Sequence, residues 1–170
     1  MSASPELGVP RSAAGPDLLR SVFRRQAAGV AVVTAARGGR PAGFTATSLT
    51  SVAAESPLVS FGIGTGSSSR PVVAEAGFVG VRIRAERQRE LAATFARGGA
   101  GRFAPPTRWT AGPEGVPLLK GVLGWLVCRV AARVPAGDHR VVLAEAVAGE
   151  VAEADRPLLW HQGCFNALRD

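Results

Sequence analysis

The sequence predicts a mainly β protein with a few helices, built as one antiparallel barrel of six to seven strands. Short runs of β-branched and apolar residues recur along the chain with turn signals between them, and several follow one another as hairpins. Helical patterns are too few to alternate with the strands, which argues against a doubly wound parallel sheet. A chain of 170 residues with 46% hydrophobic residues is the size of one domain with one core.

The N-terminal half is expected to place a short helix before three strands. Residues 1–16 are expected to form a disordered tail, so that the domain covers 17–170. Asp17 is placed to cap a helix that runs to Phe23, and its apolar residues recur every three to four positions and would pack one stripe on the core. The strands expected next cover Val30–Thr34, Gly43–Val52 and Leu58–Phe61, with Arg37–Arg40 as the turn of a hairpin.

The C-terminal half is expected to contain two more helices and the longest strands. Five glycines and four prolines mark Gly98–Pro117 as a long irregular loop of the kind that often carries function. The expected helices are Ser67–Ala76 and Glu86–Ala96. The expected strands are Phe78–Ile83, Val122–Val134, Arg140–Val151 and Pro157–His161, with Pro135–Asp138 as the turn between the two long ones.

The composition limits the partners of the chain. Its formal net charge is +7, but the basic residues are 19 arginines and one lysine scattered without interleaved aromatics, so nucleic acid is not expected as a partner. No apolar stretch is long enough to span a bilayer. Cys128 and Cys164 form neither a CxxC pair nor a metal spacing, and Cys128 lies in an apolar run typical of a buried free thiol. We expect a cytoplasmic protein without a metal site or a membrane partner.

A glycine-rich segment, Gly62–Ser67, stands between a predicted strand and a predicted helix and partly resembles a dinucleotide-binding turn. Ser67 occupies the third glycine position, and the next strand ends in Arg82 and Arg84 where an acidic residue would hold a ribose, so a Rossmann domain is not favoured. Ser67, Ser68 and Ser69 at a helix start would still suit a phosphate group. A simple serine cap is the alternative.

Hydroxyl side chains crowd the segment Gly43–Val52. Together with the strand backbone they offer donors and acceptors along one edge, which suits the rim of a planar heteroaromatic ring. A threonine-rich edge strand without a ligand has the same composition and remains open.

A polar cluster, Gly137-Asp138-His139-Arg140, occupies the tip of the last long hairpin. Asp138 can orient and charge the His139 imidazole, and the adjacent arginine makes the cluster suited to a phosphate or a carboxamide. A plain polar turn is the alternative.

These signals share their linear order with a known family. The chain resembles the flavin reductase-like family, the small reductase components of two-component flavin-dependent monooxygenases, over roughly Leu19 to Leu168. The segments that carry the resemblance are Thr34, Gly43–Ser48 with Ser51-Val52, Pro57–Val59, Gln88 with Leu91 and Phe95, Gly137–His139, and Pro157–Leu159. The resemblance implies an antiparallel, six- to seven-stranded Greek-key FMN-binding split barrel, and an enzyme that uses NADH or NADPH to reduce FMN or FAD.

The resemblance also implies roles for individual positions. The segment Thr45, Ala46, Thr47 and Ser48, with Ser51, would line the flavin ring. The turn Ser67, Ser68 and Ser69 and the junction from Arg84 to Gln88 would lie near the flavin phosphate. His139 would take the nicotinamide side, as the one residue assigned to catalysis. Trp160 would approach the flavin or a partner subunit, since family members are typically homodimers.

Some positions depart from the family pattern. Many members have Asn where this chain has Thr47, and many have Asn before a Leu where this chain reads Val81-Arg82-Ile83. The C-terminal aromatic pair is changed to Phe165-Asn166, and the chain contains no tyrosine. These departures bear on the preference for flavin and nicotinamide more than on the fold.

The expected reaction is hydride transfer between two stacked cofactors, in which the protein binds and orients and the flavin carries the redox chemistry. A flavin-dependent oxygenase is the expected consumer of the product. An alternative is a flavin-binding protein that transfers electrons or oxidises a substrate directly, without steady turnover of NAD(P)H. That protein would share the flavin residues and differ around His139 and the loop Gly98–Pro117.

Overall fold

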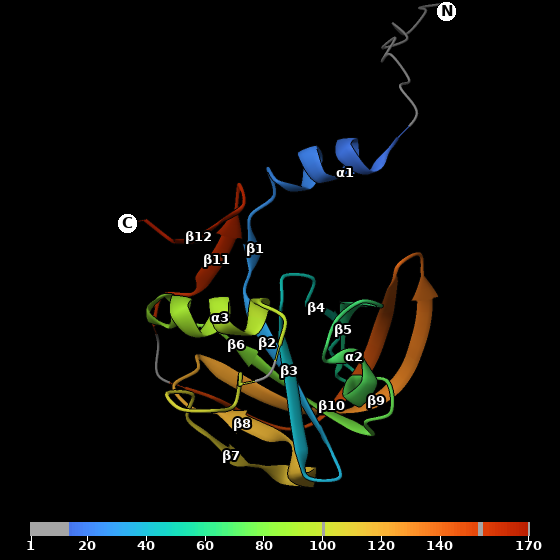
Figure 1. The fold of residues 1–170 in the computed structure, drawn as a ribbon, viewed down its shortest axis with the longest axis vertical. Helices are drawn as coiled ribbons and strands as arrows, with labels where there is room; N and C mark the ends of the chain where they lie inside the picture. The colour runs from blue at the N-terminus through green and yellow to red at the C-terminus, as the bar shows by residue number, and fades with distance from the viewer. Residues whose placement is uncertain (1–13, 100, 153–154, 170) are drawn as a thin grey trace, which may run out of the picture.

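The computed structural model describes residues 14–99, 101–152 and 155–169 (Figure 1). Its centre is a seven-stranded antiparallel sheet with the strand order β3-β2-β6-β9-β10-β5-β4. The chain builds β2 and β3 at one edge, crosses to β4 and β5 at the other edge, and then returns to the middle with β6. All neighbouring strands of this sheet are antiparallel, so the predicted fold class is confirmed. The strands of this sheet are β2 (Ala31–Arg37), β3 (Arg40–Ala46), β4 (Thr50–Ala53), β5 (Leu58–Gly64), β6 (Phe78–Ile83), β9 (Gly124–Ala136) and β10 (His139–Val151).

The sheet curls so that its edge strand β3 comes close to β5, the neighbour of the other edge strand β4, without forming a ladder. The ring of Phe44 on β3 meets that of Phe61 on β5 at 6.1 Å between centroids. Beside them, the hydroxyl of Ser69 donates to the carbonyl of Gly43 over 2.7 Å. We call this junction the seam. Among the described residues, no backbone ladder closes the barrel at the seam.

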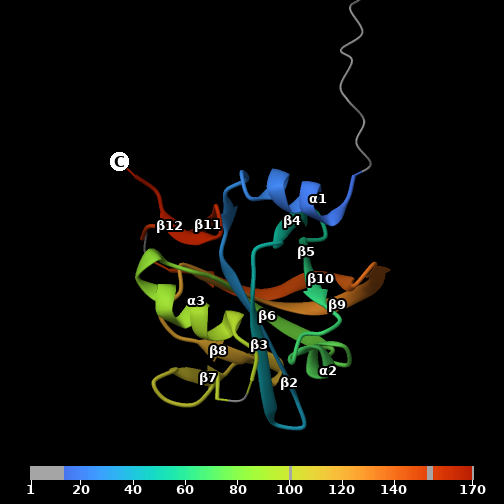
Figure 2. The same cartoon turned by 45° about the horizontal axis from the view of Figure 1, so that its top comes forward.

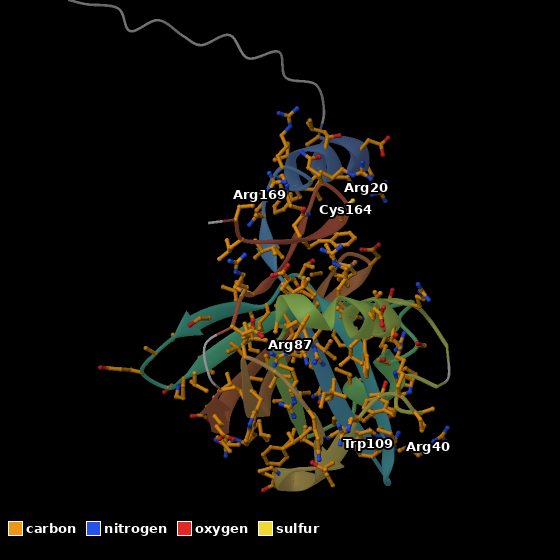
Figure 3. All side chains as sticks on the ribbon, turned by 90° about the vertical axis from the view of Figure 1, so that its left-hand side faces the viewer. Arg20, Arg40, Arg87, Trp109, Cys164 and Arg169 are labelled. Atoms are coloured by element: carbon orange, nitrogen blue, oxygen red, sulfur yellow. The ribbon has the colours of Figure 1, made fainter. Side chains whose placement is uncertain are left out.

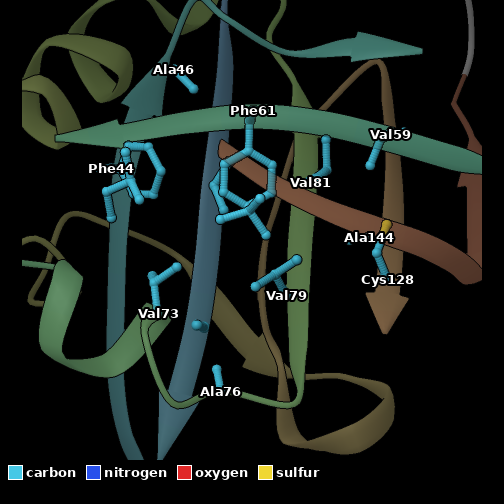
Figure 4. Close-up of a cluster of buried hydrophobic side chains, with 14 residues drawn as sticks. Phe44, Ala46, Val59, Phe61, Val73, Ala76, Val79, Val81, Cys128 and Ala144 are labelled. Carbon is cyan, nitrogen blue, oxygen red and sulfur yellow. The ribbon is translucent and has the colours of Figure 1, made fainter. Parts of the chain in front are cut away.

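The core fills the inside of the barrel with small β-branched and aromatic side chains. Phe44 and Phe61 point inward above Val79 and Val81 of β6 (Figure 4). Cys128 of β9 joins this cluster at 0% exposure, and burial raises the pKa of its thiol to about 11, as expected for an inert structural thiol. These inward positions alternate with outward ones, which explains the period-two pattern in the sequence.

Helix α1 (Pro16–Phe23) corrects one prediction. The helix forms, but Gly15 is its N-cap and Asp17 lies in its first turn. Its apolar stripe covers no core in this chain, because Leu19 and Phe23 remain 60% and 59% exposed. The helix lies outside the barrel, at the end occupied by β1 and β11–β12 (Figures 1 and 2). Residues 1–13 of the predicted tail lie outside the described part of the chain.

The other helices are shorter than predicted. Helix α2 (Arg70–Val73) has only four residues, since Ser67–Ser69 form turns and Ala74–Ala76 leave the helix. The predicted helix Glu86–Ala96 is divided into a 3-10 turn, η1 (Glu86–Gln88), and α3 (Arg89–Ala96). Helix α3 packs its buried Ala92 and Phe95 against the outer face of β2 and β3.

The strand predictions needed three corrections. The segment Gly43–Val52 is two strands, because Thr47–Leu49 leaves the sheet between β3 and β4. The expected loop Gly98–Pro117 contains β7 (Trp109–Ala111) and the 3-10 turn η2 (Pro113–Gly115), and β8 (Pro117–Leu119) pairs back on β7. The C-terminal strand β11 (Leu158–His161) lies between β1 (Ala28–Gly29) and an unpredicted β12 (Cys164–Ala167).

Two arginines are buried at the end of β6, where Arg82 lies in the strand and Arg84 follows directly after it. Arg82 and Arg84 are both 0% exposed. The Arg82 guanidinium donates to the carbonyls of Pro117 (3.0 Å) and Val81 (3.2 Å). The three guanidinium nitrogens of Arg84 have no partner among the described residues, and burial, with repulsion by Arg82, lowers its pKa to about 9.

Candidate functional site

Three segments meet at the end of β5 beside the seam. Strand β10 begins at His139, which pairs with Gly64, and Val141 pairs with Gly62. On the other side of β5, the segment Thr47–Leu49 crosses from β3 to β4 and brings Ser48 onto the same strand end. Residues far apart in the sequence therefore form one polar cluster, Ser48, Gly62, Gly64, Asp138 and His139, which we call the seam cluster.

Ser48 is fixed by the backbone of β5. The amide of Gly62 donates to the Ser48 hydroxyl oxygen over 2.9 Å. Strand β4 pairs with β5 only from Leu58 to Ser60, so beyond Ser60 that edge of β5 has no ladder partner among the described strands. An exposed strand edge presents amides and carbonyls that a planar ligand with rim donors and acceptors can use.

The two glycines leave space between the polar side chains. A Cβ on Gly62 would lie 3.5 Å from the Ser48 hydroxyl and 3.8 Å from the His139 ring, and a Cβ on Gly64 would lie 3.7 Å from His139 Nε2. These are ordinary contact distances, so a side chain at either position would fit without strain and would occupy the space between the polar side chains. The glycines keep this face of β5 flat, as required for a ring stacked against the backbone.

The imidazole of His139 is oriented by its neighbour. His139 Nδ1 lies 2.7 Å from an Asp138 carboxylate oxygen, and the His139 side chain keeps 54% exposure. The hydrogen bond from His139 lowers the pKa of the Asp138 carboxyl. Because a carboxylate only accepts, Nδ1 carries the proton, and Nε2 faces Gly64 and the open side of the cluster. The turn itself is held by Thr65, whose amide and hydroxyl both donate to the Asp138 carbonyl.

The other residues predicted for the flavin ring lie along β3 and β4. Thr47 and Ser51 are exposed near the seam, and Ala46 is buried. The Thr45 hydroxyl donates to the Ala92 carbonyl over 2.6 Å, so it anchors α3. Contact of these residues with a flavin stays a prediction.

The serine turn, Ser67–Ser69, does not have the helix-start chemistry that the sequence predicts for a phosphate site. Ser69 is buried at the seam, and its amide donates to the Ser67 hydroxyl over 3.3 Å. A four-residue α2 adds almost no dipole, and Ser69 makes no side-chain cap. Charge at this end comes instead from arginine, since Arg102 donates to both Ser69 Oγ and the Gly43 carbonyl, over 2.7 and 2.6 Å.

Arg84, Gln88 and Trp160 lie away from the seam cluster. Gln88 stands at the start of α3, where its amide donates to the Lys120 carbonyl over 3.2 Å. Trp160 packs edge-on against Phe165 at 5.0 Å between ring centroids, in the cluster with Val30 and Leu158. Since Ser69 neighbours the other end of α3, the serine turn and Gln88 cannot hold one phosphate together. Their cofactor contacts remain predictions.

Sequence reasoning missed Gly62 and Gly64 as site residues, because the glycine-rich segment was interpreted as a turn. The structure extends β5 through Gly64. The available signal was glycine at alternate positions directly after a strand, which indicates close approach of a ligand or another chain.

Neither a membrane span nor a metal cluster is present in the described ranges. No helix there is both long and apolar enough to cross a bilayer. No group of three or more His, Cys, Asp and Glu side chains there is arranged to hold a metal ion. The chemistry available at the seam cluster is hydrogen bonding, stacking and orientation by one imidazole.

An antiparallel split barrel with hydroxyls, bare strand backbone and an oriented imidazole at its seam defines a class of barrel proteins that bind flavin nucleotides. A model of the "flavin reductase like domain" matches residues 23–169. The chain therefore belongs to the flavin reductase-like family, whose members are oxidoreductases.

Named relatives share most of their length with this chain. It is 39% identical to an NADH:FMN oxidoreductase of Rhodococcus erythropolis over 169 residues, covering 92% of this chain and 88% of that one. A solved flavin reductase domain protein of Arthrobacter sp. FB24 superposes with a TM-score of 0.86 at 39% identity, covering 91% of this chain and 96% of the other. An NADH:FAD oxidoreductase of Streptomyces globisporus, solved with NAD and FAD fragments, gives a TM-score of 0.84 at 29% identity, covering 90% and 92%.

Proposed function

We propose that this flavin reductase transfers a hydride from NADH or NADPH to FMN or FAD at the seam cluster. The observation that carries the assignment is the convergence of Ser48, the unpaired edge of β5 and the oriented His139 at one end of β5. Support comes from a relative named NADH:FMN oxidoreductase, and from the similar NADH:FAD oxidoreductase structure solved with NAD and FAD fragments.

The flavin supplies the redox chemistry, and the protein supplies position. Hydroxyls of Thr47 and Ser48 and the free edge of β5 bind the polar rim of the isoalloxazine. The flat surface of Gly62 and Gly64 leaves room for a second ring. His139 directs Nε2 toward that space and orients the carboxamide of the nicotinamide, while Asp138 fixes the imidazole tautomer. No proton shuttle is required of these residues.

The direct test pairs each nicotinamide with each flavin. Purified protein is mixed with FMN or FAD and with NADH or NADPH, and loss of absorbance by the reduced nicotinamide is followed over many turnovers. Turnover in at least one pairing is the expected result. Flavin binding without turnover in all four pairings would favour the alternative, a flavoprotein that transfers electrons or oxidises its substrate directly.

The product is expected to leave for an oxygenase. Related structures include the reductase component of a tryptophan halogenase and component B of a nitrilotriacetate monooxygenase, which supports a partner that consumes reduced flavin. Coupled assays with an oxygenase should proceed when this protein is the only source of reduced flavin. Free thiols at Cys128 and Cys164 agree with a cytoplasmic location.

A second copy of the chain is the expected cover for α1. Leu18, Leu19, Val22 and Phe23 leave 45 to 60% of their surfaces exposed on one short helix. Apolar surface of this kind is stabilised by burial in an interface. Light scattering should give twice the chain mass for the parent, and the mass of a single chain for the double variant Leu19→Ser, Phe23→Ser. A parent of single-chain mass would contradict this proposal.

A further inference from the structure

A small hollow lies between helix α2 and the two-stranded ribbon of β9 and β10, toward the end of that hairpin which projects from the barrel (Figures 1 and 2). The hollow encloses about 100 Å³. Its lining combines three arginines, Arg70, Arg133 and Arg140, with apolar side chains that include Ile63 and Val142. We call it the α2 hollow.

The α2 hollow and the seam cluster lie on opposite faces of the same strand ends. Arg140 pairs with Ile63, whereas His139 pairs with Gly64. Successive side chains of a strand point to opposite faces, so Arg140 is turned away from the face on which His139 and Gly64 meet. The serine turn contributes no residue to the described lining of the hollow. A ligand in the α2 hollow would therefore be separate from the space proposed for the two cofactor rings.

The positive charge of the α2 hollow is not compensated by the described chain. No Asp or Glu is among the described residues of its lining, and none of its arginines forms an ion pair with a described residue. Two arginines labelled in Figure 3, Arg20 and Arg87, lie elsewhere on the molecule and have acidic partners. Asp17 lies 3.2 Å from Arg20, and Asp155 lies 2.6 Å from Arg87. Cations that face apolar walls without a counter-ion favour the binding of an anion.

The three arginines differ in the donors that they have left to offer. Arg133 is held by α2, since its guanidinium donates to the Val73 carbonyl over 2.9 Å. Arg140 donates from one terminal nitrogen to the His139 carbonyl over 3.1 Å, and its other guanidinium nitrogens have no acceptor in the described chain. The Arg70 guanidinium bonds to no described residue, and its Nε is buried. A buried donor without an acceptor costs free energy, so an anion that accepts from Arg70 and Arg140 would be stabilising.

The size and the lining of the α2 hollow favour a short carboxylate. Its volume of about 100 Å³ is well below the roughly 300 Å³ at which pockets for drug-sized ligands and cofactors begin. A carboxylate can accept two parallel bonds from a guanidinium. The apolar walls include Ile63, Val73 and Val142, each at most 3% exposed, and they suit a short aliphatic stem.

We propose that the α2 hollow binds a small aliphatic carboxylic acid, whose carboxylate is held by Arg70 and Arg140. The bound acid joins α2 to the ribbon that carries His139, so it ties the hairpin tip to the barrel without entering the cofactor site. The proposal is independent of the hydride transfer proposed above, because binding of the acid requires neither flavin nor nicotinamide.

The experiment follows the thermal midpoint of the protein during titration with sodium acetate, propionate and butyrate, with sodium chloride of equal ionic strength as the reference. A ligand that binds only the folded chain raises the midpoint as it saturates the site. Propionamide, a neutral analogue of propionate, tests the need for charge. The variants Arg70→Gln and Arg140→Gln remove the proposed contacts. Arg129→Gln is the matched control, because it removes an exposed arginine from the same strand as Arg133 but outside the hollow.

Propionate and butyrate should raise the midpoint of the parent and saturate at millimolar concentrations, whereas propionamide should have no effect. Arg70→Gln and Arg140→Gln should each weaken propionate binding about tenfold, and Arg129→Gln should keep the parental value. Each variant is compared with itself in sodium chloride, so a change in its own stability does not affect the comparison. Added FMN should leave the saturating concentration unchanged. An effect no larger than that of sodium chloride, an equal loss in Arg129→Gln, or displacement of propionate by FMN would overturn the proposal.

Discussion

Replacing Arg84 by methionine is expected to stabilise the protein. The Arg84 side chain is fully buried, its guanidinium has no partner in the described chain, and its pKa is lowered to about 9. A displacement of one pH unit corresponds to about 1.4 kcal/mol, so this burial costs roughly 4 to 5 kcal/mol at neutral pH. Methionine fills most of the same space with an unbranched apolar chain, and the remaining void costs about 1 to 3 kcal/mol. The net expected gain is about 1 to 4 kcal/mol.

The gain should depend on pH in a defined direction. Because the folded pKa lies below the unfolded one, the unfolded chain binds more protons above pH 9, and the parent gains stability as pH rises there. Arg84→Met lacks this group. Its advantage over the parent should therefore be complete below about pH 9 and should shrink at higher pH.

Urea unfolding at pH 7 and pH 10 measures both effects, and Arg82→Met provides the contrast. Burial also lowers the pKa of Arg82, to about 10, but its guanidinium donates to the carbonyls of Pro117 and Val81. Arg82→Met leaves these carbonyls without that donor, so it should be about 1 to 3 kcal/mol less stable than Arg84→Met. The reasoning is refuted if Arg84→Met is less stable than the parent at pH 7. That result would mean that an anion compensates Arg84, and weakened FMN binding in the same variant would identify it as the flavin phosphate.

Three further outcomes concern the seam cluster. His139→Ala should raise the apparent KM for NAD(P)H and cost about 1 to 3 kcal/mol in kcat/KM while flavin affinity stays near parental, and parental nicotinamide kinetics would reduce Gly137–Arg140 to a plain turn. Gly64→Ala should keep or slightly raise the thermal midpoint, because the new Cβ meets His139 at an ordinary 3.7 Å. The same Cβ occupies the space proposed for the nicotinamide ring, so the KM for NAD(P)H should rise about tenfold, and unchanged kinetics would place that ring elsewhere. Thr47→Val should weaken flavin binding by about 1 to 3 kcal/mol in a fluorescence titration, and unchanged affinity would remove Thr47 from the site.

Local sequence patterns predicted the elements whose conformation does not depend on contacts with distant parts of the chain. Strand β6 has the predicted bounds Phe78–Ile83, since a β-branched run between Gly77 and a helix start specifies a strand by itself. The spacing of the apolar residues also predicted the helix α1 correctly. Periodicity does not state what covers a stripe, and no described residue of the chain buries this one.

Individual residues of the candidate site could be predicted from the sequence, but their arrangement in space could not. His139 and Ser48 were each identified from residue type and resemblance. Their meeting across β5 depends on the register of β10 with β5, which places His139 opposite Gly64. The same pairing keeps Gly62 and Gly64 in a strand despite their low β propensity, because tertiary hydrogen bonds outweigh the local preference. A single sequence contains no direct measure of that register.

The seam gives the barrel a place where it can open at low cost. The neighbouring strands of the main sheet are joined by backbone ladders, whereas β3 meets β5 through the rings of Phe44 and Phe61, beside the hydrogen bond from the Ser69 hydroxyl to the Gly43 carbonyl. Separating these groups breaks few bonds, so amides next to the seam should exchange with solvent sooner than those of β6 and β9. On the proposed function, a flavin at the seam would enter and leave by local opening of this junction, while the ladders of the rest of the sheet stay intact.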